Sequence, residues 1–164
     1  RPQPGDEWQK FVSNYLDAPN DPLLPFGHGL SYTDFEYSDI ESSADILPEN
    51  GELILQATVT NTGSYDGAEV VQLYIRDVVR SITPPAKQLI GFEKIFLRSG
   101  ESQTVEFTIT AEDLKFYNSQ LQHVYELGEF QFAIGGSSDI DFQGSFELVL
   151  RDRTRTTQQN TSSR

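Results

Sequence analysis

The sequence contains no cysteine, and this absence removes two kinds of site at once. Neither a disulfide framework nor a thiolate metal centre is possible. Basic residues are also scarce, because Lys and Arg number 12 against 25 Asp and Glu, and the formal net charge is −13. Such a charge opposes binding to nucleic acid and to anionic membrane surfaces, so we expect neither as a partner.

Long apolar runs are missing too. No stretch approaches the roughly 18 apolar residues of a membrane-spanning helix. The opening RPQPGDEWQK has neither the basic start nor the apolar centre of a signal peptide. The chain also begins at Arg1 rather than Met. We therefore expect it to be cut from a longer precursor, which would have carried any targeting signal.

What is present is an alternation of apolar and polar residues with a period of two, which is typical of strands with one buried face. In segment 52–60, Leu53, Leu55, Ala57 and Val59 fall on one face and polar residues on the other. The same alternation, with turn residues between the segments, predicts further strands at 35–40, 69–76, 88–97, 102–110, 123–127, 129–134 and 142–150.

Short strands at this spacing, without βαβ units, indicate an all-β sandwich of about seven strands with Greek-key connections. The alternation breaks only after the strand at 102–110. There Thr110 and Asp113 have the spacing that caps a single helical turn, so we expect one turn between two strands.

Two segments lie outside the strand pattern. Residues 1–33 hold five of the eight prolines together with several aromatic side chains, which suits an extended segment packed against another surface. Residues 151–164 contain no apolar residue and are expected to form a disordered tail.

No motif positions catalytic groups. A pair of carboxylic acids about 5 to 9.5 Å apart can hydrolyse a glycosidic bond, but acids such as Glu106 and Glu147 fall on the polar faces of strands. The two histidines, His28 and His123, lack the spacing of a metal site and are interpreted as structural. We expect no catalytic residue, no cofactor and no metal site in this chain.

Aromatic residues make up 12% of the sequence, which raises the alternative of a sugar-stacking surface. Most rings on the strands, however, share the apolar face and are expected in the core. These core rings are Phe107, Phe130, Phe132 and Phe146.

Four strings carry a resemblance to a known family: PFGHGLSYTDFEYS at 25–38, VTNTGSYDGAEVVQLYIRD at 59–77, PPAKQLIGFEKIFLRSGES at 84–102 and ELGEFQFAIGGSS at 126–138. Together they resemble the C-terminal region of family 3 glycoside hydrolases, above all of bacterial periplasmic β-glucosidases. The resemblance covers residues 1–150 in order. One departure is His28, where family members often have Tyr.

The resemblance implies an immunoglobulin-like or fibronectin type III-like β-sandwich at 34–150, reached through a linker at 1–33 from a preceding α/β sandwich domain. It also implies a periplasmic or secreted parent enzyme, a retaining β-glucosidase, with β-xylosidase as the alternative activity. In that family the nucleophile lies on a barrel domain and the acid/base usually on the α/β sandwich domain. The sequence matches neither catalytic position, so the carbohydrate substrate would be reached only through the parent.

On this interpretation the partners of the chain are those two catalytic domains. The leading residues 1–33 and the loop 77–87 are expected to contact them. The expected contact residues are Trp8, Tyr15, Phe26, His28, Tyr32 and Lys87. The alternative is an independent carbohydrate- or surface-binding module.

Overall fold

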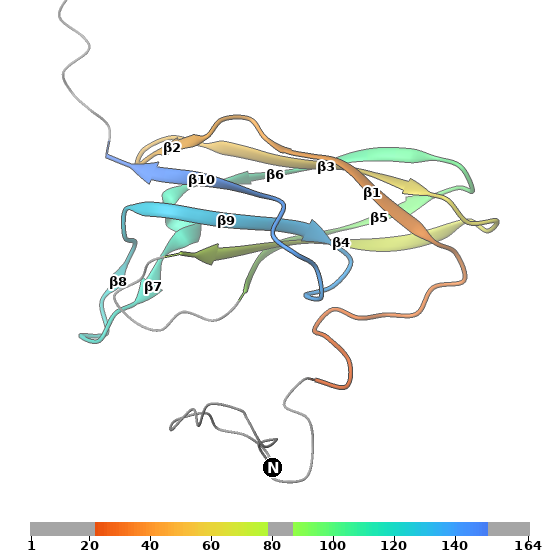
Figure 1. Cartoon of the computed structure of the whole chain (residues 1–164), viewed down its shortest axis with the longest axis horizontal. Helices are drawn as coiled ribbons and strands as arrows, with labels where there is room; N and C mark the ends of the chain where they lie inside the picture. The colour runs from red at the N-terminus through yellow and green to blue at the C-terminus, as the bar shows by residue number, and fades with distance from the viewer. Residues whose placement is uncertain (1–21, 79–86, 151–164) are drawn as a thin grey trace, which may run out of the picture.

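The computed structural model describes residues 22–78 and 87–150. This part of the chain forms ten strands and one turn of 3-10 helix (Figure 1). In chain order the elements are β1 (Phe35–Ser42), β2 (Ile46–Pro48), β3 (Leu53–Asn61), β4 (Gly67–Asp77), β5 (Gln88–Leu97), β6 (Ser102–Ile109), η1 (Ala111–Leu114), β7 (Phe116–Tyr117), β8 (His123–Val124), β9 (Gly128–Gly135) and β10 (Gly144–Val149).

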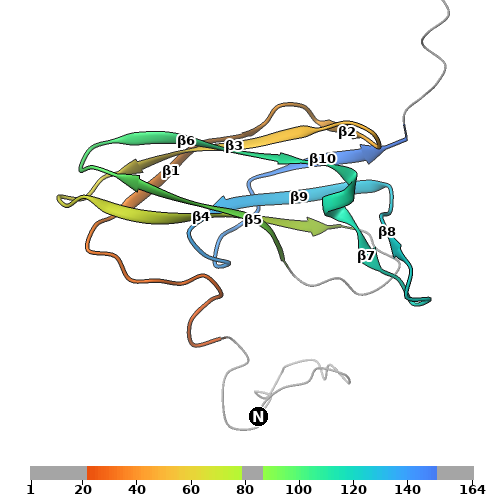
Figure 2. The same cartoon turned by 180° about the vertical axis from the view of Figure 1, so that it is seen from behind.

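Two sheets face each other, as the views from opposite sides show (Figures 1 and 2). One has the order β1-β3-β6 and the other the order β2-β10-β9-β4-β5, while β7 and β8 form a separate pair. Neighbouring strands are antiparallel except β2 and β10, which run parallel. The prediction of an all-β sandwich is confirmed.

The core lies between the sheets because each sheet turns its apolar face inward. In β3, every second residue from Leu53 onward is fully buried, as the alternation predicts. The rings of Phe130 on β9 and Phe146 on β10 stack with their centroids 5.6 Å apart. Burial of one such ring, or of one Leu, Ile or Val of the core, stabilises the fold by about 1.5–3 kcal/mol. The aromatic residues assigned to the core are indeed buried there or packed against it.

The strand count differs from the expected seven or so. Seven strands have six residues or more, and they fall on the predicted segments. The two strands that were not predicted, β2 and β7, have only three and two residues, which is too short for an alternating pattern to be recognised. The segment 123–127, expected to be one strand, is paired only at its first two residues.

The edge strand β1 contains a bulge. Its register against β3 shifts between Ser38 and Glu41, and Asp39 has a φ of 47°. Aspartate is one of the few residues that adopt the left-handed region readily, because its short polar side chain can bond locally. The regular ladder of β1 is therefore broken in its middle.

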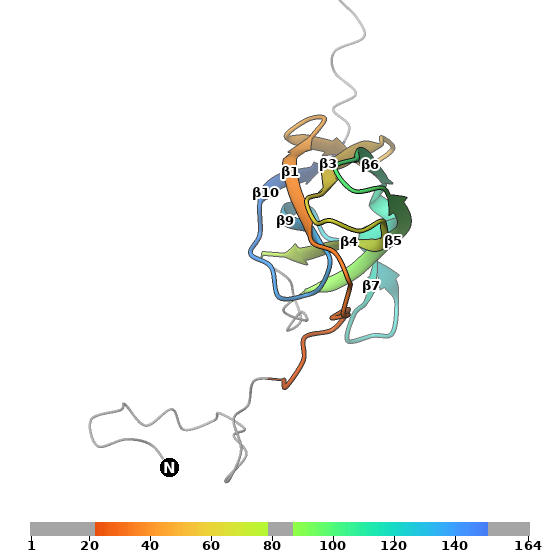
Figure 3. The same cartoon turned by 90° about the vertical axis from the view of Figure 1, so that its right-hand side faces the viewer.

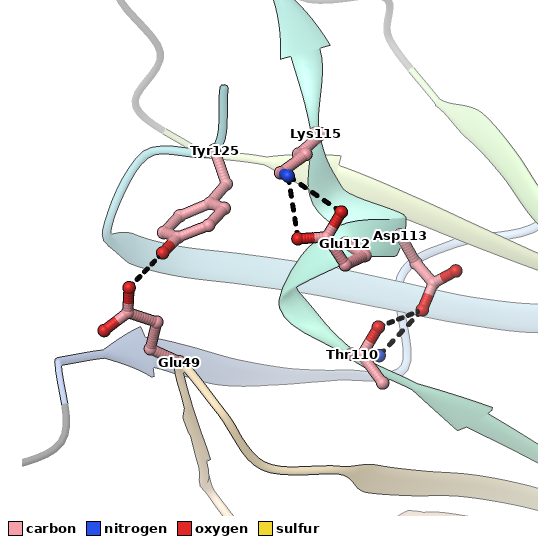
Figure 4. A network of polar contacts seen from close by, with 6 residues as sticks. All are labelled: Glu49, Thr110, Glu112, Asp113, Lys115 and Tyr125. Atoms are coloured by element: carbon pink, nitrogen blue, oxygen red, sulfur yellow. Dashed lines mark hydrogen bonds and ion pairs between the residues drawn. The ribbon is translucent and has the colours of Figure 1, made fainter. Parts of the chain in front are cut away.

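The predicted helical turn is present as η1, at the end of the sandwich drawn in Figure 4. Oδ2 of Asp113 accepts hydrogen bonds of 2.8 Å from both the amide and the hydroxyl of Thr110. Lys115 bonds both carboxylate oxygens of Glu112 at 2.7 Å. The Tyr125 hydroxyl donates to Glu49, which raises the pKa of Tyr125. The contacts of Asp113 and Glu112 are local to the turn, whereas the hydrogen bond from Tyr125 to Glu49 ties the connection between the sheets to the turn after β2.

Candidate docking surface

Residues 22–33, here called the leading segment, approach the sandwich from outside the five-stranded sheet (Figure 3). Its last residue is fixed to the sandwich, since Thr33 is buried and its hydroxyl donates a 2.6 Å hydrogen bond to Oδ1 of Asn61. The Thr33 amide also donates to the hydroxyl of Ser31 at 3.2 Å. The junction with β1 is thus part of the folded domain.

A second anchor lies at Gly27, which has a φ of +79°. A Cβ at this position would come within 2.2 Å of the side-chain oxygen of Gln72 on β4, so a larger residue would have to adopt a positive φ and also displace this hydrogen-bonded side chain. The Phe26 carbonyl accepts a 2.8 Å hydrogen bond from the amide of Ser138. The leading segment therefore lies directly on the outer side of the five-stranded sheet.

Gln72 is buried although it points away from the core. Its amide nitrogen donates to the Gly136 carbonyl at 2.5 Å, and its oxygen accepts a 2.6 Å hydrogen bond from Tyr74. Burial raises the pKa of the Tyr74 phenol. Polar groups are tolerated in such a buried position because they are hydrogen-bonded.

Beside these anchors is a pocket of about 470 Å³ at the rim of the sandwich. Residues 27–31, residues 134–137 and three side chains, Tyr37, Glu69 and Val70, form part of its wall. The Tyr37 hydroxyl donates to Glu69 at 2.9 Å. Burial raises the pKa of Glu69, an effect that the hydrogen bond from Tyr37 opposes. Burial and the neighbouring Glu69 carboxylate raise the pKa of Tyr37.

Although its backbone is anchored, the leading segment exposes large apolar side chains. Tyr32 is 96% exposed and Phe26 is 66% exposed. The others of this kind are Leu23, Leu24 and Leu30. A cluster of exposed apolar groups on one stretch of chain is typical of a surface that another molecule or domain covers.

The residues expected at an interdomain contact fall into three groups. Trp8 and Tyr15 lie outside the described residues. Phe26, His28 and Tyr32 lie together on the leading segment and are exposed. Lys87 is only partly exposed and donates to the carbonyls of Ser138 and Ile140, with its ammonium group 5.2 Å from the Phe142 ring. Most of the expected loop 77–87 lies outside the described residues.

The sequence interpretation missed two aromatic residues on β5. Phe92 is 69% exposed and Phe96 is 63% exposed, and both point away from the core. A signal for them exists in QLIGFEKIFL, which has apolar residues on both faces of the strand. Strands with two apolar faces are usually covered on both.

In residues 22–78 and 87–150, no three His, Asp or Glu side chains are grouped so that they could bind a metal ion. Nor does this part of the chain contain a helix with the length and apolar character needed to span a membrane.

Comparison with known proteins gives a consistent result. The family model for the fibronectin type III-like domain matches residues 69–138. The chain is 46% identical over 149 residues to the periplasmic β-glucosidase of Salmonella typhimurium, covering 91% of this chain and 20% of that protein. It is also 46% identical over 139 residues to a putative β-xylosidase of Formosa agariphila, covering 84% of this chain and 18% of that protein.

Solved structures agree. The crystal structure of a β-glucosidase from Listeria innocua in complex with glucose superposes with a TM-score of 0.75 and 39% identity, covering 90% of this chain and 20% of that one. The chain thus spans about a fifth of the length of the proteins it matches.

The two facing sheets and the family match define the class of this molecule, a fibronectin type III-like β-sandwich. Within that class, the chain belongs to the fibronectin type III-like domains of family 3 glycoside hydrolases.

Proposed function

We propose that the chain is a non-catalytic domain of a retaining β-glucosidase and that it supports the catalytic domains during hydrolysis of terminal β-linked glucose from oligosaccharides and β-glucosides. In this proposal residues 1–33 link it to a preceding α/β sandwich domain, and residues 34–150 form the domain itself. The parent enzyme would be periplasmic or secreted, as the name of the Salmonella relative suggests.

The observation that carries the proposal is the exposure of apolar side chains on the leading segment, whose backbone is held in place. Two anchors, at Gly27 and Thr33, hold its backbone against the sandwich, yet its apolar side chains face outward. Ordering exposed apolar side chains costs conformational entropy and returns nothing unless a partner covers them. A neighbouring catalytic domain would bury the side chains of Phe26, Tyr32 and Leu30. The burial of each would stabilise the docked state by about 2 kcal/mol.

The parent activity has a second candidate. The β-xylosidase relative is as similar in sequence to this chain as the first β-glucosidase. The choice of sugar would be made by residues of the catalytic domains. β-Glucosidase is preferred because the similar solved structures carry that name.

The test uses a chimaera in which this chain replaces the matching 149 residues of the Salmonella enzyme. We expect the chimaera to fold and to cleave an aryl β-glucoside, whereas the purified chain alone should show no turnover of aryl β-glucosides or β-xylosides. Phe26→Ala and Tyr32→Ala should lower the thermal midpoint of the chimaera more than that of the isolated chain. Equal losses in both would show that these rings serve the sandwich itself.

The alternative function, an independent sugar-binding module, makes a different prediction for the isolated chain. A module of that kind should be retained on insoluble β-glucan or xylan without any catalytic domain. Retention that disappears on changing Phe26 and Tyr32 would contradict the proposed supporting role.

A further inference from the structure

We infer that the outer side of strands β4 and β5 is a second part of the docking surface and that it is covered by the domain that precedes the leading segment in the parent enzyme. This β4–β5 outer face consists of Val70, Phe92, Lys94 and Phe96. The inference rests on the proposed function and adds residues that neither the family match nor the sequence motifs assign to a contact.

The first argument is the orientation of the two rings. In an antiparallel pair, residues directly opposite one another point to the same side of the sheet. Phe92 pairs with Gln72 and Phe96 pairs with Ala68. Because Val71 and Leu73 point into the core, these pairs point outward. Both Phe rings therefore lie on the side of the sheet that faces away from β1-β3-β6.

The second argument is continuity with the leading segment. Gly27 packs on Gln72, the cross-strand partner of Phe92. Ala68 and Val70, the partners of Phe96 and Lys94, line the rim pocket together with residues 27–31. Seen from the end, the leading segment runs away on the β4 and β5 side (Figure 3). The exposed side chains of the leading segment and of β5 thus form parts of one surface.

The third argument is chemical. Lys94 is the single charged residue among these four, and Arg76, which is also on the outer side of β4, lies over the Phe142 ring. The residues opposite Phe96, Lys94 and Phe92 are the apolar Ala68 and Val70 and the buried Gln72. A pyranose chain carries many hydroxyl groups that need hydrogen-bond partners, and among the four side chains of this face Lys94 alone has a polar group. Protein interfaces, in contrast, are rich in aromatic side chains and poor in charge at their centre. The face fits an apolar patch of a folded domain better than it fits a sugar.

The rings of the unmodified chain provide the direct test. Hydroxyl-radical footprinting should oxidise Phe92 and Phe96 readily in the isolated chain and at least fivefold more slowly in the chimaera with the Salmonella enzyme. Tyr65, which is 67% exposed in the turn between β3 and β4, is the internal control and should react alike in both. If Phe92 and Phe96 react equally fast in both proteins, the inference is wrong.

The same experiment separates this inference from the proposed function. Phe26 and Tyr32 report on docking of the leading segment. Protection of these two rings without protection of Phe92 and Phe96 would overturn the inference and leave the proposed function standing. No protection at any of the four rings would overturn both.

A variant gives a second measurement. The double change Phe92→Ser and Phe96→Ser should lower the thermal midpoint of the chimaera by several degrees and leave that of the isolated chain within one degree or so of the unmodified protein. Ile54→Ser, a change on the outer side of the three-stranded sheet, is the matched control and should affect both proteins equally. Two further footprinting results would contradict the inference. If Phe92 and Phe96 of the isolated chain are oxidised more slowly as its concentration rises, a second copy of the chain covers them. If they are oxidised more slowly when soluble β-glucan is added, a sugar covers them.

Discussion

Thr33 and Asn61 are joined by a buried hydrogen bond of 2.6 Å between their side chains, although they are 28 residues apart. The Asn61 amide nitrogen donates in turn to the carbonyls of Tyr65 and Leu97, and its oxygen accepts from the amide of Gly63. One side chain therefore joins the end of the leading segment, the β3–β4 turn and the end of β5. The position where a linker was expected to end is a fixed point of the fold.

Removing this side chain should destabilise the whole domain. Asn61→Ala leaves several buried groups without partners, and we expect a loss of about 2–4 kcal/mol in the free energy of unfolding. Thr33→Val keeps the shape and removes one hydrogen bond, at about 1 kcal/mol. Urea denaturation of the full chain measures both. Thr60→Val is the control, because its hydroxyl bonds Ser102 at the exposed surface, and a loss there as large as that of Asn61→Ala would contradict the assignment.

Two glycines of the leading segment should respond differently to the same change. Gly27→Ala places a Cβ against Gln72 and forces a positive φ on alanine, so the local contact should weaken by about 1–2 kcal/mol. The Ser138 amide, which bonds the Phe26 carbonyl, should then exchange with deuterium roughly 5 to 30 times faster. Gly29→Ala has open space around the new methyl group and should leave this amide unchanged. Similar rates in the two variants would refute the anchor.

The stability of the domain should depend on pH through Glu69. Burial raises its pKa in the folded chain above the ordinary 4.5, so in the interval between the two values the folded state binds more protons than the unfolded state. This contribution to stability is complete below about pH 4.5 and is lost as the pH rises through the folded value. Glu69→Gln keeps an oxygen for Tyr37 and carries no charge. Its stability relative to the unmodified chain should therefore increase from acid to neutral pH.

Denaturation midpoints measured from pH 4 to 8 test this dependence. Tyr37→Phe removes the hydrogen bond that opposes the effect of burial, so it should steepen the loss of stability with pH. Combining it with Glu69→Gln should abolish that steeper loss. Parallel curves for the unmodified chain and Glu69→Gln would show that this carboxylate does not contribute.

Replacing a core phenylalanine should destabilise the isolated chain far more than replacing a surface phenylalanine. Phe130→Ala removes a buried ring that stacks on Phe146 and should cost about 3–5 kcal/mol. Phe92→Ala removes an exposed ring and should change the stability by less than about 0.5 kcal/mol. Thermal unfolding followed by circular dichroism is sufficient. A large loss for Phe92→Ala would place that ring in the packing of this domain and not at its outer surface.

The long strands could be predicted because their alternation records one buried face. Leu53, Leu55, Ala57 and Val59 on β3 are buried as the period of two requires, and so are Val71, Leu73 and Ile75 on β4. The cap formed by Asp113 was predictable for a similar reason, since it depends on residues three positions apart. Local spacing carries this information, and the resemblance to known domains agrees with it.

The rest depends on contacts between distant segments. Gln72 occupies a polar position of an alternating strand and yet is buried, because residues around Gly27 and Gly136 cover it; Tyr74, at the next such position, is buried as well and bonds Gln72. The alternation of residues within β4 cannot show that Gln72 is covered by Gly27, which lies 45 residues away in the sequence. The hydrogen bonds of Lys87 could not be predicted from the sequence either, because its acceptors are carbonyls of a turn more than 50 residues along the chain.

The bulge at Asp39 also affects how the molecule behaves in a concentrated solution. An uninterrupted edge strand offers a row of free amides and carbonyls on which a strand of another molecule can assemble, and fibrils grow in this way. In β1 the register shift and the positive φ of Asp39 interrupt that row, while the edge strand β2 is only three residues long and ends at Pro48. At these two edges another molecule cannot easily add strand by strand, although the exposed rings of the domain still offer apolar surface on which other molecules can gather.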